Sequence, residues 1–255
     1  MMRSLPKIHL LELKCEFLKM FRLPAYVIPT LAFPMIFYVF FGLAFGTKSS
    51  VGATYMASYL IATYGAFGVI GASLFGFGVS VAVERGQGWL QVKRAAPMPL
   101  SAWFGAKIGM ALLFSAIIVA GLALLGIAFG GVHFGPTVWP LLFITLVAGA
   151  LPFCALGLMI GYLAGPNSAP AIVNVIYLPM SFASGLWIPM EFMPKFVQKI
   201  APMLPAFHFA RLALIVIGAA KESAIGHIIA LIAFTLVFAT LATVAYRRDE
   251  GKVYG

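Results

Sequence analysis

The chain has 255 residues, of which 62% are hydrophobic and only 9% are charged, and its formal net charge is +10. This composition excludes a disordered chain and an ordinary soluble protein, and the length allows about six membrane spans without a soluble domain. The basic residues lie in loops and at the ends, where they set orientation and meet lipid headgroups rather than nucleic acid. We therefore predict an all-α membrane protein with one transmembrane domain, residues 1–255.

The chain begins with an amphipathic segment, residues 6–22 (PKIHLLELKCEFLKMFR), which predicts a helix lying in the membrane interface. Its apolar side chains share one face, and its charged side chains, including Glu12, Glu16 and Lys19, spread over the rest. Pro24 ends this helix. The alternative is a simple cytosolic leader, and we favour the interfacial helix because its apolar face continues into the first span.

Six apolar stretches follow that predict membrane-spanning helices. They cover residues 25–46, 54–83, 104–129, 137–164, 168–187 and 224–245. Glycines four residues apart at Gly157, Gly161 and Gly165 indicate close helix packing. Ionisable side chains inside a membrane mark ion or proton paths, and no Asp, Glu, Lys or Arg falls in the middle of these stretches.

Residues 84–103 (ERGQGWLQVKRAAPMPLSAW) form a polar connection between the second and third spans. Two glycines permit a turn, a short apolar piece follows, and Pro97 and Pro99 stop any further helix. A short amphipathic helix here fits a groove on a soluble partner. A generic basic cytosolic loop explains the same residues equally well.

Residues 188–222 are too polar and too rich in proline to cross the membrane. Two short helices that dip into the outer leaflet and return fit this segment, because exposed apolar runs are costly. The alternative is an external loop with a surface helix. The candidate residues of the re-entrant part, 188–212, are Pro189, Glu191, Pro194, Pro202, Pro205 and His208.

Orientation follows from the basic residues on each side of the membrane. Twelve Lys and Arg residues lie in the N-terminal segment, the 84–107 region and the tail, against five on the other side, so both termini should be cytoplasmic. The phosphate-loop pattern GxxxxGK[ST] is absent, and the chain offers neither a metal-ligand spacing nor a catalytic cluster. Any energy for active transport must come from another chain.

These features together resemble the membrane subunit of type-2 ATP-binding-cassette (ABC) exporters. Four of them carry the resemblance: the N-terminal helix, the connection E-R-G-x-G-x-L-x-x-x-R-x-x-P-x-P (residues 84–99), the number of spans, and the segment PMEFMPKFVQKIAPMLPAFHFARL (residues 189–212) before the last span.

The resemblance implies that residues 84–99 couple the chain to a soluble ATPase subunit that carries ATP and Mg. The residues it points to are Glu84, Arg85, Gly86, Gly88, Trp89, Leu90 and Arg94. Two ATPase copies and two permease copies, a homodimer, would assemble in the bacterial cytoplasmic (inner) membrane, with no cofactor or metal on this chain. Family substrates are drugs, antibiotics, lipids and peptides, with lipid-linked glycans or sodium as alternatives.

The same resemblance implies a translocation path lined by the first, second and fifth spans. Candidate residues are Phe37, Tyr55, Tyr59, Phe67, Asn174, Tyr177 and Ser181. An apolar, aromatic path suits an amphipathic substrate, although aromatic residues of membrane proteins often only face lipid or pack. A channel or ion-coupled carrier is the alternative function; it predicts charges within the membrane or an internal repeat.

Overall fold

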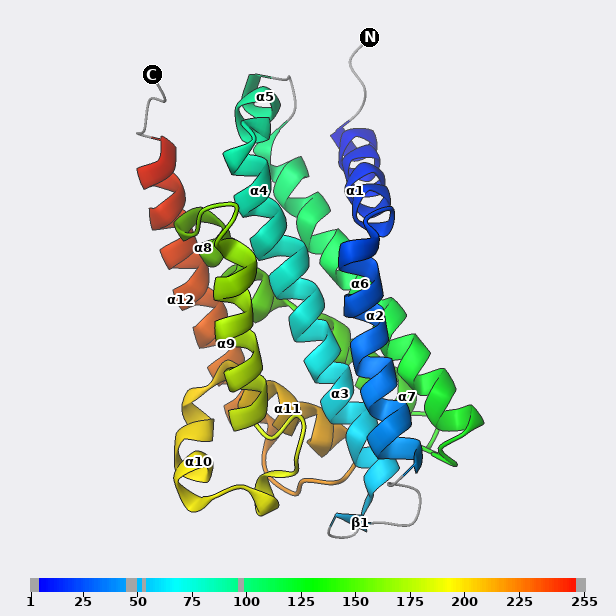
Figure 1. Ribbon diagram of the computed structural model, residues 1–255. Helices are drawn as coiled ribbons and strands as arrows, with labels where there is room; N and C mark the ends of the chain where they lie inside the picture. Colours follow the sequence, from blue (N-terminus) through cyan, green and yellow to red (C-terminus); the bar gives the residue numbers. More distant parts are fainter. Residues whose placement is uncertain (1–4, 45–49, 52–53, 96–98, 251–255) are drawn as a thin grey trace.

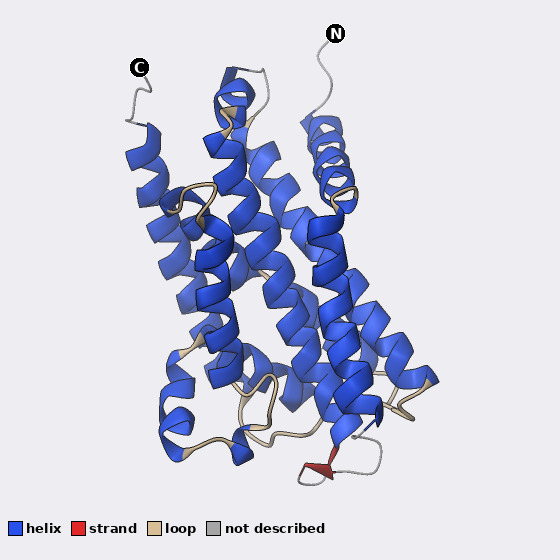
Figure 2. Ribbon diagram, viewed as in Figure 1, coloured by secondary structure: helices blue, strands red, loops and turns tan. Residues whose placement is uncertain are grey.

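The computed structural model describes residues 5–44, 50–51, 54–95 and 99–250. Three of the basic residues counted for the orientation, Arg3, Lys48 and Lys252, lie outside this part, as does Pro97 of the connection between the second and third spans. The described chain is almost entirely helical, and a two-stranded antiparallel ladder of β1 (Ser50–Val51) and β2 (Thr54–Tyr55) is its only sheet (Figure 2).

Five helical stretches in the described chain are long and apolar enough to cross a membrane. They are α2 with η1 (Pro24–Phe37, Tyr38–Ala44), α3 with η2 and α4 (Met56–Ser73, Leu74–Val79, Ser80–Gly86), α6 (Leu100–Ala128), α7 with α8 (Val138–Ala148, Leu151–Leu163), and α12 (Ala224–Glu250). The prediction of an all-α protein with several membrane spans is confirmed.

The fifth predicted span, residues 168–187, is shorter than expected. Its helix α9 covers Ala169–Ala183, which is 15 residues and less than a bilayer core requires. The helix ends because Gly185 adopts a φ of +74°, the left-handed conformation that commonly terminates helices. The chain then continues through a 3-10 turn, η3 (Met190–Phe192).

The span made by α3, η2 and α4 lies at the centre of the bundle (Figure 1), and every residue of α3 after Met56 is buried. Glycines allow its close approach to α8. A Cβ atom on Gly78 would lie 2.9 Å from Gly157 O, and one on Gly161 would lie 2.9 Å from Gly78 O. The glycine spacing therefore does serve helix packing at Gly157 and Gly161, while Gly165 has no comparable contact.

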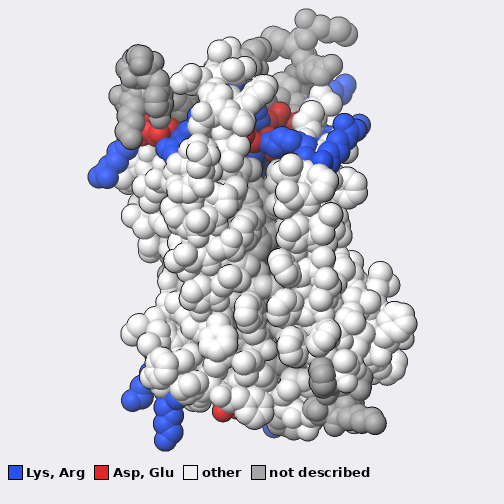
Figure 3. Space-filling view, in the orientation of Figure 1, with Lys and Arg blue, Asp and Glu red and all other residues white. Residues whose placement is uncertain are grey.

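One end of the bundle carries most of the charge. Helices α1 (Leu5–Phe21) and α5 (Trp89–Ala95) and the end of α12 gather there, and Lys, Arg, Asp and Glu side chains cluster on them above a broad uncharged band (Figure 3). We call this end the charged end. The opposite end holds α10 (Lys195–Ile200), η4 (Ala201–Met203) and α11 (Pro205–Val216). The chain bends by 95° between the helical segments that precede and follow Leu204.

Only part of the apolar face of α1 is buried within the bundle. Leu13 and Phe17 pack against α6 and Met20 is buried, whereas Leu10 and Phe21 are exposed. Glu16, assigned by the sequence to the polar side, is buried. The reason is that Glu16 meets a lysine of α6, which compensates its charge.

Candidate functional site

Six charged side chains from four helices meet at the charged end, and we call them the charged cluster. They are Glu12, Glu16 and Lys19 of α1, Glu84 of α4, Lys93 of α5 and Lys107 of α6. The Lys107 side chain is completely buried, and its Nζ lies 2.6 Å from Glu84 Oε1 and 2.9 Å from Glu16 Oε2. Three carboxylates therefore balance three ammonium groups.

The remaining contacts extend the charged cluster across all four helices. Lys19 pairs with both Glu16 and Glu84, and Lys93 Nζ lies 2.5 Å from Glu12 Oε1. Burial alone raises the pKa of the Glu16 carboxyl, but Lys107 and Lys19 outweigh burial and lower that pKa to about 2. Glu16 thus stays ionised at neutral pH and ties α1 to the third span through Lys107 and to α5 through Lys93.

The predicted coupling residues fall into two groups, and the first group points inward. Glu84 belongs to the charged cluster and also accepts a hydrogen bond from Trp103 Nε1 at 3.3 Å. Arg85 donates from Nη1 to Tyr162 O at 2.6 Å and to Asp249 Oδ1 at 2.9 Å, which joins α4 to α8 and α12. These side chains hold the helix ends together and do not form an outer surface.

The second group forms the turn and the outer face of α5. Gly86 is close to Pro166, since a Cβ there would lie 2.6 Å from Pro166 Cγ, and Gly88 has a φ of +75° that favours glycine. Trp89 is 54% exposed and Val92 60% exposed, whereas Leu90 is buried. The side chain of Arg94 lies outside the described atoms. Helix α5 therefore presents two apolar side chains at the charged end.

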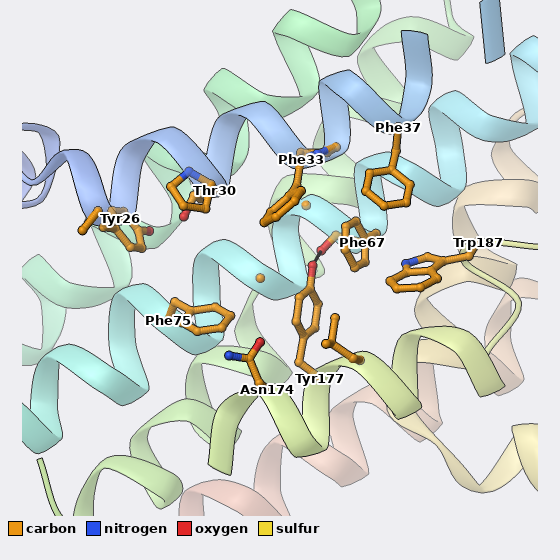
Figure 4. A pocket seen from close by; sticks show the side chains of 15 residues that line it. Tyr26, Thr30, Phe33, Phe37, Phe67, Phe75, Asn174, Tyr177 and Trp187 are labelled. Atoms are coloured by element: carbon orange, nitrogen blue, oxygen red, sulfur yellow. Dashed lines mark hydrogen bonds between the residues drawn. The ribbon is translucent and has the colours of Figure 1, made fainter. Parts of the chain in front are cut away.

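A second candidate site is a groove between α2, α3 and α9, with a volume of about 480 Å³ (Figure 4). We call it the aromatic groove. It is lined by Tyr26, Thr30, Phe33, Phe37, Phe67, Phe75, Asn174, Tyr177 and Trp187, together with smaller residues. None of the described residues that line it is Asp, Glu, Lys or Arg.

Contacts between aromatic rings fix the wall of the aromatic groove. The Phe67 and Tyr177 rings stack with centroids 4.9 Å apart. The Trp187 ring packs against Phe67, and the centroids of these two rings are 5.5 Å apart. Tyr177 also donates a hydrogen bond to Phe67 O at 2.9 Å. A Cβ on Gly71 would lie 2.8 Å from the Tyr177 hydroxyl, so glycine there gives that hydroxyl room to reach α3.

The structure brings together four of the seven predicted path residues. Phe37, Phe67, Asn174 and Tyr177 line the aromatic groove. The other three, Tyr55, Tyr59 and Ser181, do not line it: Tyr55 is exposed on β2, while Tyr59 and Ser181 are buried elsewhere.

The prolines predicted to shape the re-entrant segment mark its turns. Pro189 and Pro194 directly precede η3 and α10, Pro202 lies within η4, and Pro205 is the first residue of α11. Glu191 is exposed on η3. His208 lies on α11, which extends to Val216, four residues beyond the predicted limit of 212.

Comparison with known proteins identifies the family to which the chain belongs. A family model described as "ABC-2 type transporter" matches residues 11–217, most of the chain. The chain belongs to the ABC-2 type transporter family. It is also similar to a Bacillus subtilis (strain 168) protein named "Putative transport permease YvfS", with 28% identity over 235 residues that cover 92% of this chain and 95% of the relative.

Family membership makes this ABC-2 permease a multi-pass subunit of a membrane transporter and implies an ATPase subunit as its partner. Sequence reasoning missed two features of the sites. Lys107 was counted as a loop charge, although a lysine inside an apolar helix signals a buried partner. The link from Arg85 to Asp249 spans 164 positions and has no local signal.

Proposed function

We propose that this ABC-2 permease forms the translocation path of an ATP-driven exporter for amphipathic or lipophilic substrates, such as drugs, antibiotics, lipids or peptides. The observation that carries the proposal is the aromatic groove. Its wall is built from Phe, Tyr and Trp rings, with Thr30 and Asn174 as polar points, and it has no fixed charge among its described lining residues. Such a surface binds apolar groups by burial and leaves few polar groups to satisfy.

The absence of charge in the groove favours this proposal over an ion-coupled carrier. Carriers of that kind place acidic or basic groups on the ion path within the membrane. The charged cluster lies instead at one end of the bundle, where its charges pair with one another. The charged cluster therefore links the helices at that end and does not line the aromatic groove.

In the proposed assembly, two copies of this chain pair and two soluble ATPase chains, carrying ATP and Mg, bind beneath them. Exposed Trp89 and Val92 on α5 provide an apolar contact for each ATPase. Motion received by α5 passes directly to α4, which is the last part of the second span. It passes to α1 through the charged cluster. The assembly lies in the bacterial cytoplasmic membrane, with the charged end and both termini in the cytoplasm.

Co-purification tests the partner and the contact together. A tagged permease extracted in mild detergent should retain a soluble ATPase in an equal number of copies, and Trp89→Ala should lose most of it while remaining in the membrane. Phe192→Ala is the matched control, because Phe192 is similarly exposed at the opposite end and should leave the ATPase bound. A permease that purifies without an ATPase would instead favour a channel or carrier.

A further inference from the structure

Two histidines face each other at the end opposite the charged end, where α11 meets the first turns of α12. His208 Nδ1 lies 2.9 Å from His227 Nδ1. The outer nitrogens also have partners: His208 Nε2 lies 2.9 Å from Pro202 O, and His227 Nε2 lies 3.0 Å from Glu222 Oε1. The four groups form one continuous chain of three polar contacts.

The number of protons in this chain is constrained by simple chemistry. Each contact at hydrogen-bond distance needs one N–H, and the Pro202 carbonyl and the ionised Glu222 carboxylate can only accept. A neutral imidazole carries one N–H, so two neutral rings supply two protons for three contacts. Without another proton, one contact sets two lone pairs against each other.

We propose that His208 and His227 form a site for a single proton. The two Nδ1 atoms share this proton, and the resulting hydrogen bond holds α11 against α12. One added proton supplies the missing N–H and leaves the pair with one positive charge. A second added proton would place two N–H donors opposite each other, so the site takes one proton and excludes another. A metal ion fits less well, because two nitrogen ligands at about 2.0–2.1 Å around a tetrahedral zinc lie farther apart than a hydrogen bond.

The surroundings of the pair suit a single positive charge. Glu222, in the loop before α12, attracts the proton, while Arg211 of α11 pairs with Glu222 and offsets part of that attraction. From α11 and α12, the Phe207 and Phe234 rings flank the imidazoles, with centroids 5.6 Å and 6.2 Å from that of His208.

The site makes the junction between α11 and α12 sensitive to pH. All three hydrogen bonds are made while the pair holds one proton. One of them is lost when that proton leaves as the pH rises. Histidine changes charge between about pH 5 and pH 8, and burial lowers the pKa of His208 within this pair. The α11 helix should therefore be held more firmly at the acid end of that range than at neutral or higher pH.

Nitrogen-15 NMR of the full chain, labelled at histidine and held in lipid nanodiscs, tests the shared proton directly. We expect scalar coupling between the two Nδ1 nuclei through one proton, and its loss in both His208→Gln and His227→Gln. His133→Gln is the control, since His133 is exposed in the loop before α7, and it should keep the coupling. Two uncoupled imidazoles that titrate independently would overturn the proposal.

Hydrogen exchange provides a second measurement that depends on neither the ATPase nor transport. After correction for the intrinsic rate, the amides of α11 should be several-fold better protected at about pH 5 than at about pH 8 in the unaltered chain, because burial lowers the pKa of His208. That difference should vanish in His227→Gln and persist in His133→Gln. The same pH dependence in all three proteins would show that the pair does not hold α11.

Discussion

Lys107 lies between two carboxylates at the charged end, and its side chain has no exposed surface. Lys107→Met keeps a stem of similar length but leaves Glu16 and Glu84 without their fully buried cation. Removing one partner of a buried ion pair costs about 3–5 kcal/mol, because the remaining charge is buried without compensation. We expect a loss of that size in the free energy of unfolding, measured by denaturant titration in detergent micelles.

Lys14→Met is the matched control for this substitution, because Lys14 is exposed on α1. Its free energy of unfolding should change by less than about 0.5 kcal/mol, as is usual for surface positions. Adding Glu84→Gln to Lys107→Met should recover part of the loss by removing one uncompensated charge. Equal destabilisation by Lys14→Met and Lys107→Met would contradict the assigned role of the charged cluster.

Glu16 gives the charged cluster a specific dependence on acid. Its pKa is lowered from 4.5 to about 2 in the folded chain, so the unfolded chain takes up a proton more readily as the pH falls. The stability that Glu16 contributes is complete above about pH 4.5 and is lost as the pH falls towards 2. Unfolding followed from pH 6 to pH 3 should show a steeper loss in the unaltered chain than in Glu16→Gln. Parallel curves would show that Glu16 is not held ionised.

The sequence identified the kinds of residue at both sites better than their positions. Of the residues predicted for the translocation path, Phe37 and Tyr177 line the aromatic groove, but Tyr59 has the same chemical character and is buried elsewhere. Only the packing of α2, α3 and α9 distinguishes them. Glu16 was misplaced for a related reason: helical periodicity assigns charges to the polar face and cannot detect a compensating lysine 91 positions away.

At the level of the helices, apolar runs predicted the spans closely because a bilayer requires a minimum length. Span 4 was predicted as residues 137–164 and forms Val138–Leu163. The same reasoning made the fifth span too long, since residues 184–187 are apolar enough to continue α9 but Gly185 turns the chain. Composition therefore locates a membrane helix, and the backbone conformation of single residues sets where it ends.

The crossing of η2 with α8 depends on glycine at both helices. Gly161→Val would place its Cβ 2.9 Å from Gly78 O and from Val81 Cβ, and neither neighbour is a flexible chain end. Overpacking of this kind costs about 1–3 kcal/mol, so we expect a lower unfolding temperature in detergent. Gly226→Val is the control, because a Cβ on Gly226 of α12 meets no atom within 4 Å. Equal effects of the two substitutions would show that this close contact does not support the fold.

The whole molecule has one charged end, which holds α1, α5 and the end of α12, and one end that holds α10 and α11. Since basic residues are retained in the cytoplasm, the charged end should face inward and α10 outward. The chain supplies its own internal control for this orientation. Cys15 is exposed at the charged end, and Cys154 is buried. Lys195 begins α10 and is exposed at the other end.

A maleimide that cannot cross membranes should therefore label Lys195→Cys in intact cells, in a chain that also carries Cys15→Ser. In the unaltered chain the same reagent should label Cys15 only after the membrane is permeabilised. The two reactions report opposite ends of one bundle, so a single orientation must account for both. Labelling of Cys15 in intact cells, with Lys195→Cys protected, would invert the molecule and place α5 where no cytoplasmic ATPase could reach it. Labelling of both in intact cells would separate α1 from the charged end and contradict the fold itself.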